Sequence, residues 1–207
     1  MLSSKRPSLV LATHNRHKVS EIRSILKKSR LRVRLMTLDD FPTMKPVVED
    51  KPTLEGNAAK KALSVAKKTA CLALADDTGL FVKALKGKPG VYSARFAGPQ
   101  CNYADNCRKL LKLMKNVPSA RRSASFQTVA ALATPKGKVF MAKGSVAGKI
   151  TVDQRGKNGF GYDPVFFISS RKQTYAEMPA RLKNKISHRA LAFSKIAGLL
   201  RRALRST

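Results

Sequence analysis

The spacing of apolar residues predicts four helices. In each segment apolar side chains recur three or four residues apart, which places them on one helix face. Thr53 precedes the second, Ala-rich segment and is a plausible N-cap for it. The last segment directs Phe193 and Ile196 inward among other apolar residues. The four predicted helices span residues 15–28, 53–70, 103–115 and 184–204.

Strands are predicted by short apolar runs and by alternation of apolar and polar residues. Pro135, Lys136 and Gly137 separate two long runs, which predicts a hairpin. A turn is expected at Gly87–Gly90 and a Pro-rich loop at residues 41–53. The predicted strands span residues 8–14, 31–38, 72–76, 81–85, 124–135, 138–152 and 165–169.

This mixture of elements indicates an α/β protein with a mixed sheet. Strands and helices do not alternate strictly, and no repeat or linker divides the 207 residues. We therefore expect a single domain over residues 1–207, with two lobes around a central cleft. No apolar run approaches the roughly 18 residues that a membrane span requires. The three cysteines lack zinc-site spacing, so a reducing, cytoplasmic location is expected.

The charge is strongly basic, with 42 Lys and Arg against 12 Asp and Glu, a formal net charge of +30. Successive quarters of the chain hold 11, 9, 10 and 12 basic residues, so there is no basic tail. Even spreading indicates a solvated basic surface rather than a nucleic-acid-binding arm. Such a surface should still attract polyanions nonspecifically, with an affinity that falls as salt rises.

Against this charge, the adjacent acids Asp76 and Asp77 stand out in the segment "ADDTGL". They follow an apolar run, at a point where the strand is expected to end, and neighbouring carboxylates repel each other unless cations or donors offset them. Oxygen ligands of this kind suit Mg²⁺. Glu49 and Asp50 in the Pro-rich loop could complete such a site. The alternative is an exposed turn, because Asp-Asp-Thr-Gly is also common turn chemistry.

The first turn, "LATHNRHKVSE", follows a predicted strand and opens a helix. This arrangement points backbone N–H groups at an anion. Thr13 and Asn15 could add hydrogen bonds, and Lys18 could place its charge on a phosphate. The alternative is a capped surface helix with an ordinary pair between Lys18 and Glu21.

A Gly-rich loop, "GKNGFGYDP", contains Phe160 between Gly159 and Gly161. The glycines free the backbone to approach a flat ligand, and Phe160 could stack on a base. Asp163 precedes a proline, which favours an extended backbone and a fixed carboxylate direction. Phe160 and Tyr162 could equally be core aromatics.

Three basic residues, Lys183, His188 and Arg189, lie near the start of the last predicted helix. Their donors could hold a phosphate and the edge of a base. The alternative is that this basic stretch is ordinary protein surface.

Taken together in chain order, these segments resemble the inosine triphosphate pyrophosphatase family, which hydrolyses non-standard purine nucleoside triphosphates. The resemblance rests on "TxNxxKxxE", "ADDTGL" with "PGVYSARFAG", "GFGYDPVFF" and "KNxISHRALAF", and covers nearly the whole chain. It implies an elongated mixed sheet flanked by helices, a Mg²⁺ cofactor and a homodimer. "TLEGNAAKKA" also resembles a family helix through Glu55, Asn57 and Lys61.

The resemblance also implies roles for individual residues. Asp77 would be the general base and a Mg²⁺ ligand, with Asp76 and Glu49 as further acids of the metal site. Phe160 would stack on the purine. The phosphate-binding turn would comprise Thr13, His14, Asn15, Arg16, His17 and Lys18, and Thr78 would touch the substrate. The purine pocket would be shaped by Gly161, Tyr162 and Asp163, and both phosphate and the purine edge would be bound by Lys183, His188 and Arg189.

The chain departs from the family by lacking surface acids, for example at Lys83, Ala147 and Lys149. Seven of its twelve acids nevertheless lie in the motif segments. Because the acids are kept in the motif segments, we favour a nucleotide pyrophosphatase that releases pyrophosphate and a nucleoside monophosphate. The alternative from another class is a polyanion- or nucleic-acid-binding protein on a catalytically weakened scaffold.

Overall fold

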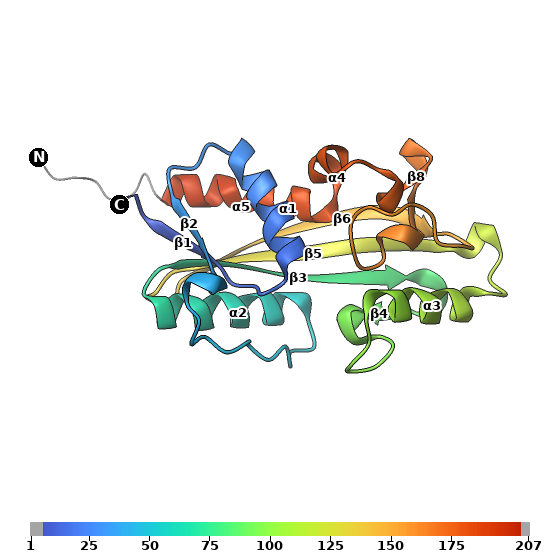
Figure 1. The fold of residues 1–207 in the computed structure, drawn as a ribbon, viewed down its shortest axis with the longest axis horizontal. Helices are drawn as coiled ribbons and strands as arrows, with labels where there is room; N and C mark the ends of the chain where they lie inside the picture. The colour runs from blue at the N-terminus through green and yellow to red at the C-terminus, as the bar shows by residue number, and fades with distance from the viewer. Residues whose placement is uncertain (1–5, 204–207) are drawn as a thin grey trace, which may run out of the picture. The chain divides into compact units, whose positions relative to one another are not determined.

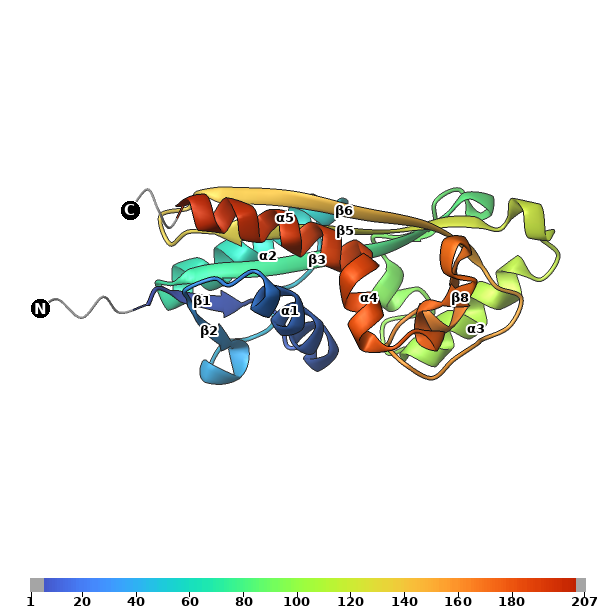
Figure 2. The ribbon, with the colours of Figure 1, turned by 90° about the horizontal axis from the view of Figure 1, so that it is seen from above.

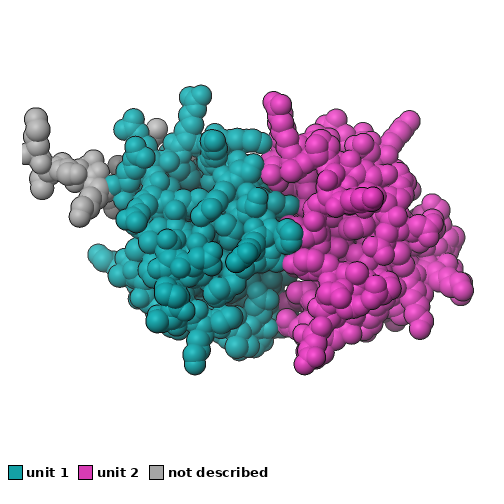
Figure 3. Space-filling view, in the orientation of Figure 1, with its two compact units in different colours: residues 1–77, 129–143, 189–207 teal, residues 78–128, 144–188 magenta. Residues whose placement is uncertain are grey.

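The computed structural model describes residues 6–203 of the chain. These residues divide into two compact units, shown in different colours in Figure 3. Unit 1 combines the described residues up to Asp77 with Val129–Lys143 and those from Arg189 onward. Unit 2 combines Thr78–Thr128 with Gly144–His188. That the units act as one two-lobed domain around a cleft stays a prediction.

The predicted helices are present with small shifts at their ends. Thr53 caps the second helix as expected, because its Oγ1 accepts a hydrogen bond from the Gly56 N–H (3.1 Å). The α-helices are α1 (Arg16–Lys28), α2 (Leu54–Thr69), α3 (Tyr103–Met114), α4 (Ala180–Ile186) and α5 (His188–Ala203). Short 3-10 turns are η1 (Leu38–Asp40), η2 (Lys83–Leu85), η3 (Ser93–Arg95), η4 (Ser119–Arg121), η5 (Asp163–Val165), η6 (Ser169–Arg171) and η7 (Tyr175–Glu177).

The strands form a mixed sheet, which confirms the predicted fold class. Within the described residues, eight strands follow the order β2-β1-β3-β5-β6-β7-β8, with β4 also paired to β3. β1 is parallel to both β2 and β3, whereas the pairs that β7 makes are antiparallel. Their bounds are β1 (Ser8–Leu11), β2 (Arg34–Thr37), β3 (Leu72–Val82), β4 (Pro89–Gly90), β5 (Ser123–Ala133), β6 (Val139–Ile150), β7 (Phe166–Ile168) and β8 (Gln173–Thr174).

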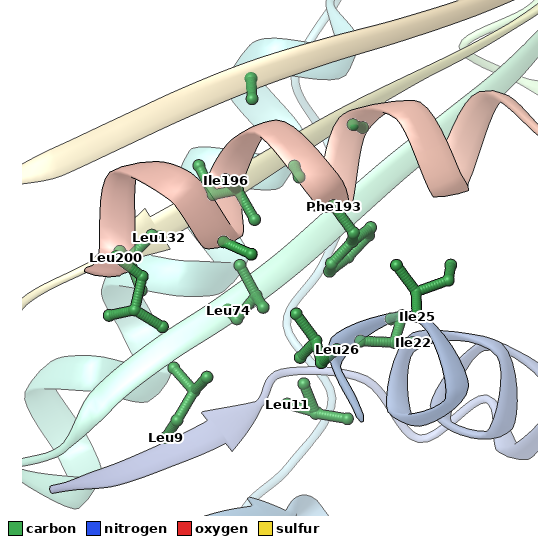
Figure 4. Packing of buried hydrophobic residues seen from close by; sticks show 14 of the residues in the cluster. Leu9, Leu11, Ile22, Ile25, Leu26, Leu74, Leu132, Phe193, Ile196 and Leu200 are labelled. Atoms are coloured by element: carbon green, nitrogen blue, oxygen red, sulfur yellow. The ribbon is translucent and has the colours of Figure 1, made fainter. Parts of the chain in front are cut away.

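In unit 1, helices cover both sides of the sheet. Figure 1 shows α2 on one side of β3, with α1 and α5 on the other; seen from above, α1 and α5 lie on the near side (Figure 2). Figure 4 shows how side chains of α1 and α5 pack against β1 and β3. Ile22, Phe193 and Ile196 are almost fully buried there. The apolar spacing predicted from sequence thus supplies this core.

Unit 2 has its own core, which is richer in aromatic residues. Phe126 packs edge-on against Phe166, with ring centroids 4.7 Å apart, and Tyr175 lies 5.3 Å from Phe166. Leu110 and Met114 of α3 are buried in the same cluster. This core holds the Gly-rich loop and α4 in place.

Two predicted element boundaries are wrong. The strands expected at 72–76 and 81–85 are one strand, β3, which runs through Asp76 and Asp77 without a turn. The single helix expected over 184–204 is two helices, because Ser187 has an extended backbone (φ −70°, ψ 158°) between α4 and α5. Residue 204, the predicted end of that helix, lies outside the described residues.

Over residues 6–203, no helix is both long and apolar enough to cross a membrane. All three cysteines are free thiols.

Candidate active site

The acidic pair lies in the middle of β3, with both side chains buried. Successive side chains of a strand point to opposite faces of the sheet. The partners agree with this rule: Asp77 contacts α2, whereas Asp76 contacts α1 and α5. The two carboxylates therefore belong to two different polar clusters of unit 1.

On the α2 face, Asp77 meets a buried amide and a buried ammonium. The Asn57 amide donates to Oδ2 of Asp77 (3.1 Å). Nζ of Lys61 lies 3.8 Å from Oδ1 of Asp77, donates to the carbonyl oxygen of Asp76 (2.6 Å), and forms a hydrogen-bonded ion pair with Glu49. Glu49 and Asp77 thus converge on one cation.

The protonation of Asp77 is set by opposing effects. Burial raises the pKa of its carboxyl group above the ordinary value, and the negative charge of Glu49 acts in the same direction. Lys61 and the hydrogen bond from Asn57 act against this, but the net shift is upward. A carboxylate with a raised pKa accepts a proton more readily than an ordinary aspartate, as a general base requires.

The donors present fit Mg²⁺ but not a metal held by protein ligands alone. Among the described residues, no group of three or more His, Cys, Asp or Glu could hold a metal ion. Magnesium, however, usually binds one or two protein carboxylates and completes its shell with water and phosphate oxygens. Glu49 and Asp77 supply such a pair, and their shared contact with Lys61 shows that they already converge on a positive charge.

On the opposite face, Asp76 is held by two cations. Oδ2 accepts hydrogen bonds from Nη2 (3.1 Å) and Nε (3.3 Å) of Arg189, and Nζ of Lys18 lies 3.3 Å away. Arg189 also donates through Nη1 to Glu21 (2.6 Å). The side chains of Arg189 and Asp76 are 2% and 0% exposed, so the centre of this network is buried, whereas Lys18 and Glu21 reach its partly exposed edge.

The charges of this network depend on one another. Burial disfavours the charged form of Arg189, but the carboxylates of Asp76 and Glu21 outweigh it and raise the pKa of Arg189. Burial lowers the pKa of the Lys18 ammonium, although Asp76 opposes the shift. The side chain of Lys18 is 17% exposed, so its ammonium lies at a partly desolvated surface, where a charged group attracts an anion more strongly than in bulk water.

The turn before α1 is organised by Asn15. Its Oδ1 accepts from the backbone N–H groups of His17 (3.0 Å) and Lys18 (3.2 Å), and its own N–H donates to Thr13 Oγ1 (3.2 Å). Asn15 therefore caps the helix, as the alternative interpretation of this stretch foresaw. The side chains of His14, Arg16 and His17 are exposed. Their contact with phosphate stays a prediction.

In unit 2, Phe160 is held by a buried ion pair. Oδ2 of Asp163 accepts from the backbone N–H of Phe160 (2.8 Å) and from Nζ of Lys183. The same ammonium lies 4.9 Å from the centre of the Phe160 ring. Gly159 has φ +75°, and a Cβ there would lie 2.0 Å from Oδ2 of Asp163. Only glycine permits this tight loop.

The other predicted site residues of unit 2 contact neighbouring groups of the protein. The buried Tyr162 donates to the carbonyl oxygen of Ser93 (2.9 Å), and burial raises the pKa of its phenol. The buried His188 ring stacks on Phe126, with centroids 4.4 Å apart and 14° between planes. Thr78 Oγ1 lies 2.7 Å from Thr128 Oγ1. Whether any of them touches substrate stays a prediction.

The structure thus brings the predicted residues together in two groups. Unit 1 holds the acids with Lys18 and Arg189; unit 2 holds the Gly-rich loop with Lys183 and His188. Arg189 was expected to act with Lys183 and His188; in the structure it forms ion pairs with Asp76 and Glu21 of unit 1, and its contact with substrate stays a prediction.

The clusters also contain residues that were given no site role from the sequence: Asn57, Lys61 and Glu21. For the first two a usable signal exists. Asn57 and Lys61 are four residues apart in an Ala-rich helix, so they share one face with small apolar residues. Polar side chains on a face that is otherwise apolar indicate a buried polar partner.

Comparison with known proteins identifies the family of the chain. Residues 9–199 match the Ham1 family. The chain is 47% identical over 194 residues to the dITP/XTP pyrophosphatase of Desulforamulus reducens, covering 94% of this chain and 96% of the relative. It is 46% identical over 186 residues to the dITP/XTP pyrophosphatase of Geobacter sulfurreducens, covering 90% and 92%.

Solved structures give the same result. A HAM1 protein from Coxiella burnetii is 36% identical with a TM-score of 0.85, covering 95% of this chain and 99% of that one. A dITP/XTP pyrophosphatase from Mycobacterium abscessus is 36% identical with a TM-score of 0.73, covering 93% and 98%. The resemblance predicted from the sequence motifs is confirmed, and the chain belongs to the Ham1 family.

Proposed function

We propose that this protein hydrolyses non-standard purine nucleoside triphosphates, of the dITP and XTP type, to the nucleoside monophosphate and pyrophosphate. The curated relatives reported above carry the name of that activity. The single observation that carries the proposal is the convergence of Glu49 and Asp77 on one cation, beside a buried amide donor. The alternative of a polyanion-binding protein gains no support from these relatives.

Glu49 and Asp77 would hold Mg²⁺ in this reaction. The bound ion would neutralise phosphate charge that otherwise repels an attacking water. Asp77 is the general base: its raised pKa suits proton acceptance, and the amide of Asn57 fixes the direction of its carboxylate. Because proton transfer by a positioned side chain contributes roughly 10²–10⁴-fold, loss of this carboxylate should remove most turnover.

Lys18 and the turn from Thr13 to Lys18 bind the phosphates. The ammonium of Lys18 is held beside Asp76, and Arg189 together with Glu21 holds Asp76 in turn. In this arrangement Arg189 acts through Asp76, by fixing the carboxylate that positions Lys18. His14, Arg16 and His17 add exposed donors at the same turn.

The purine binds to the Gly-rich loop, with Phe160 as the stacking surface. Lys183 is the donor best placed to recognise the base, because its ammonium lies 4.9 Å from the centre of that ring. Lysine donates hydrogen bonds and accepts none. It therefore favours the O6 acceptor of hypoxanthine and xanthine and disfavours the amino group of adenine.

We also infer a cytoplasmic homodimer, as the family resemblance implies. The formal charge of +30 opposes self-association, so sedimentation at low and moderate salt tests the dimer. A dimer that forms only as salt rises fits this proposal, whereas a monomer at every salt concentration excludes it.

The test is product analysis with ITP, dITP, XTP, ATP and GTP in the presence and absence of Mg²⁺. We expect pyrophosphate and the monophosphate from the first three, no orthophosphate, and no turnover after chelation. Orthophosphate release, or equal turnover of ATP, would exclude the proposal.

Two neighbouring acids of the loop before α2 provide a matched pair of variants. Glu49→Gln removes a carboxylate that contacts Lys61 and should abolish most turnover. Asp50→Asn removes an acid of the same loop whose side chain is 52% exposed and pairs with Lys60 at the surface (2.8 Å). It should leave turnover unchanged. Equal effects of the two changes would contradict a specific role for Glu49.

A further inference from the structure

Tyr103 is an aromatic residue that neither the motifs nor the proposed mechanism uses. It is the first residue of α3 and its side chain is 39% exposed. Its ring lies 5.7 Å from that of Phe160, centre to centre, with 48° between the planes. This separation is within the 4.5–7 Å range over which aromatic rings attract each other.

One face of α3 is directed at the Gly-rich loop. Tyr103 and Cys107 are four residues apart, so their side chains lie on the same side of the helix. Tyr103 meets Phe160, and the Cys107 thiol donates to the carbonyl oxygen of the next residue, Gly161 (3.3 Å). Two contacts therefore tie the loop to the first turns of α3.

That part of α3 is itself firmly positioned. Asn102 and Asp105 form a capping box: the Asp105 N–H donates to Asn102 Oδ1 (3.0 Å), and the Asn102 N–H donates to Asp105 Oδ2 (2.9 Å). Capped in this way, the helix start offers Tyr103 little freedom to move. An exposed ring on a fixed helix end can thus restrict the ring beside it.

Phe160 lies between two residues that carry no side chains, Gly159 and Gly161. Asp163 fixes the backbone N–H of Phe160, and Lys183 approaches its π-system, but the flanking Gly159 and Gly161 both have positive φ and leave the loop conformation unsupported by side chains of their own. Tyr103 adds a ring contact to those that Asp163 and Lys183 make with Phe160.

We propose, resting on the proposed function, that Tyr103 is a positioning residue for purine binding, acting by holding the ring of Phe160 in its stacking orientation. An aromatic pair contributes about 0.5–1.5 kcal/mol beyond simple burial. Tyr103→Ala should therefore raise KM for ITP about two- to twelvefold, with kcat within about twofold of the wild type. Tyr103→Phe keeps the ring and should behave as the wild type.

The experiment combines kinetics with binding of IMP, the expected product, measured by calorimetry. Tyr103→Ala should raise the Kd for IMP by the same factor as KM. In a Phe160→Ala background the same change should have almost no further effect, because the ring on which it acts is absent. Leu113→Ala alters another exposed residue of α3 and should change neither quantity.

The proposal is overturned if Tyr103→Ala leaves KM and Kd unchanged, if its effect persists in the Phe160→Ala background, or if Leu113→Ala does the same. Failure of the proposed function is a separate result. A wild-type protein that binds IMP but hydrolyses no triphosphate refutes the function, and the Kd series still decides the role of Tyr103. A wild-type protein that does not bind IMP refutes both.

Discussion

Replacing Arg189 with methionine tests whether the main role of this residue is to stabilise the buried ion network or to contact the substrate. Methionine keeps much of the side chain's length and apolar volume but removes the guanidinium. In the structure that group donates to Asp76 at 3.1 and 3.3 Å and to Glu21 at 2.6 Å. The side chains of Arg189 and Asp76 are 2% and 0% exposed, so solvent does not replace the lost contacts.

The expected cost follows from the burial of that pair. Removing one partner of a buried ion pair costs about 3–5 kcal/mol, because the other charge remains desolvated. Asp76 keeps Lys18 at 3.3 Å, which places the expected loss near the lower end, about 3 kcal/mol. For a chain of this length, about 1 kcal/mol shifts Tm by roughly 2–4 °C, so the variant should melt about 6–12 °C lower.

Urea and thermal unfolding of the wild type and Arg189→Met measure this difference in stability, with Arg201→Met as the matched control. Arg201 lies on the same helix, is exposed, and donates to the carbonyl oxygen of Ser29 (2.6 Å). Its replacement should cost less than about 1 kcal/mol. If Arg189→Met unfolds within about 1 kcal/mol of the wild type yet loses ITP turnover, the ion network contributes little and direct substrate contact is the main role of Arg189.

Three further predictions follow from individual contacts. Asp77→Asn should abolish turnover without lowering Tm at pH 7, because burial already disfavours the charged carboxylate; a large loss of stability would contradict this. Arg122→Met should lower the free energy of unfolding by at least about 3 kcal/mol in urea titrations, since the buried guanidinium donates to four backbone carbonyls. The hydrogen bond from the Thr174 N–H, together with Arg155, lowers the pKa of Glu177 below its ordinary value. The ionised Glu177 therefore stabilises the fold at neutral pH, and this stabilisation should be lost as the pH falls through the lowered pKa. In acid unfolding experiments, Glu177→Gln should show a weaker dependence of stability on pH in that range.

The sequence was sufficient to predict those features whose conformation is decided by residues close by in the chain. The cap at Thr53 and the spacing of Ile22, Phe193 and Ile196 are examples, because a cap or an apolar helix face depends on residues within a few turns. The candidate acids and the Gly-rich loop were also identifiable, since charge and glycine are unusual at those places in this chain.

The wrong boundaries have causes that lie far away in the sequence. The predicted strands left Thr78 and Gly79 outside both, with a turn there as the alternative, but a Cβ at Gly79 would lie 2.6 Å from the carbonyl oxygen of Gly90. Gly79 is therefore there for close approach of β4 and not for a turn. Likewise, no proline or glycine stands at Ser187 to predict the break between α4 and α5. Ser187 is fully buried with an extended backbone, so we attribute the break to tertiary packing rather than to the local sequence.

The continuity of β3 changes the meaning of the acidic pair. At the end of a strand, where they were expected from the sequence, adjacent carboxylates could share one environment and repel each other, and one common cation for both was therefore inferred. In a strand the same two residues face opposite ways. Asp77 then faces Lys61 and Glu49, and Asp76 faces Lys18 and Arg189. In the proposed mechanism the strand thus separates two tasks that the sequence places side by side: Asp77 would accept a proton, and Asp76 would position the cations that bind phosphate.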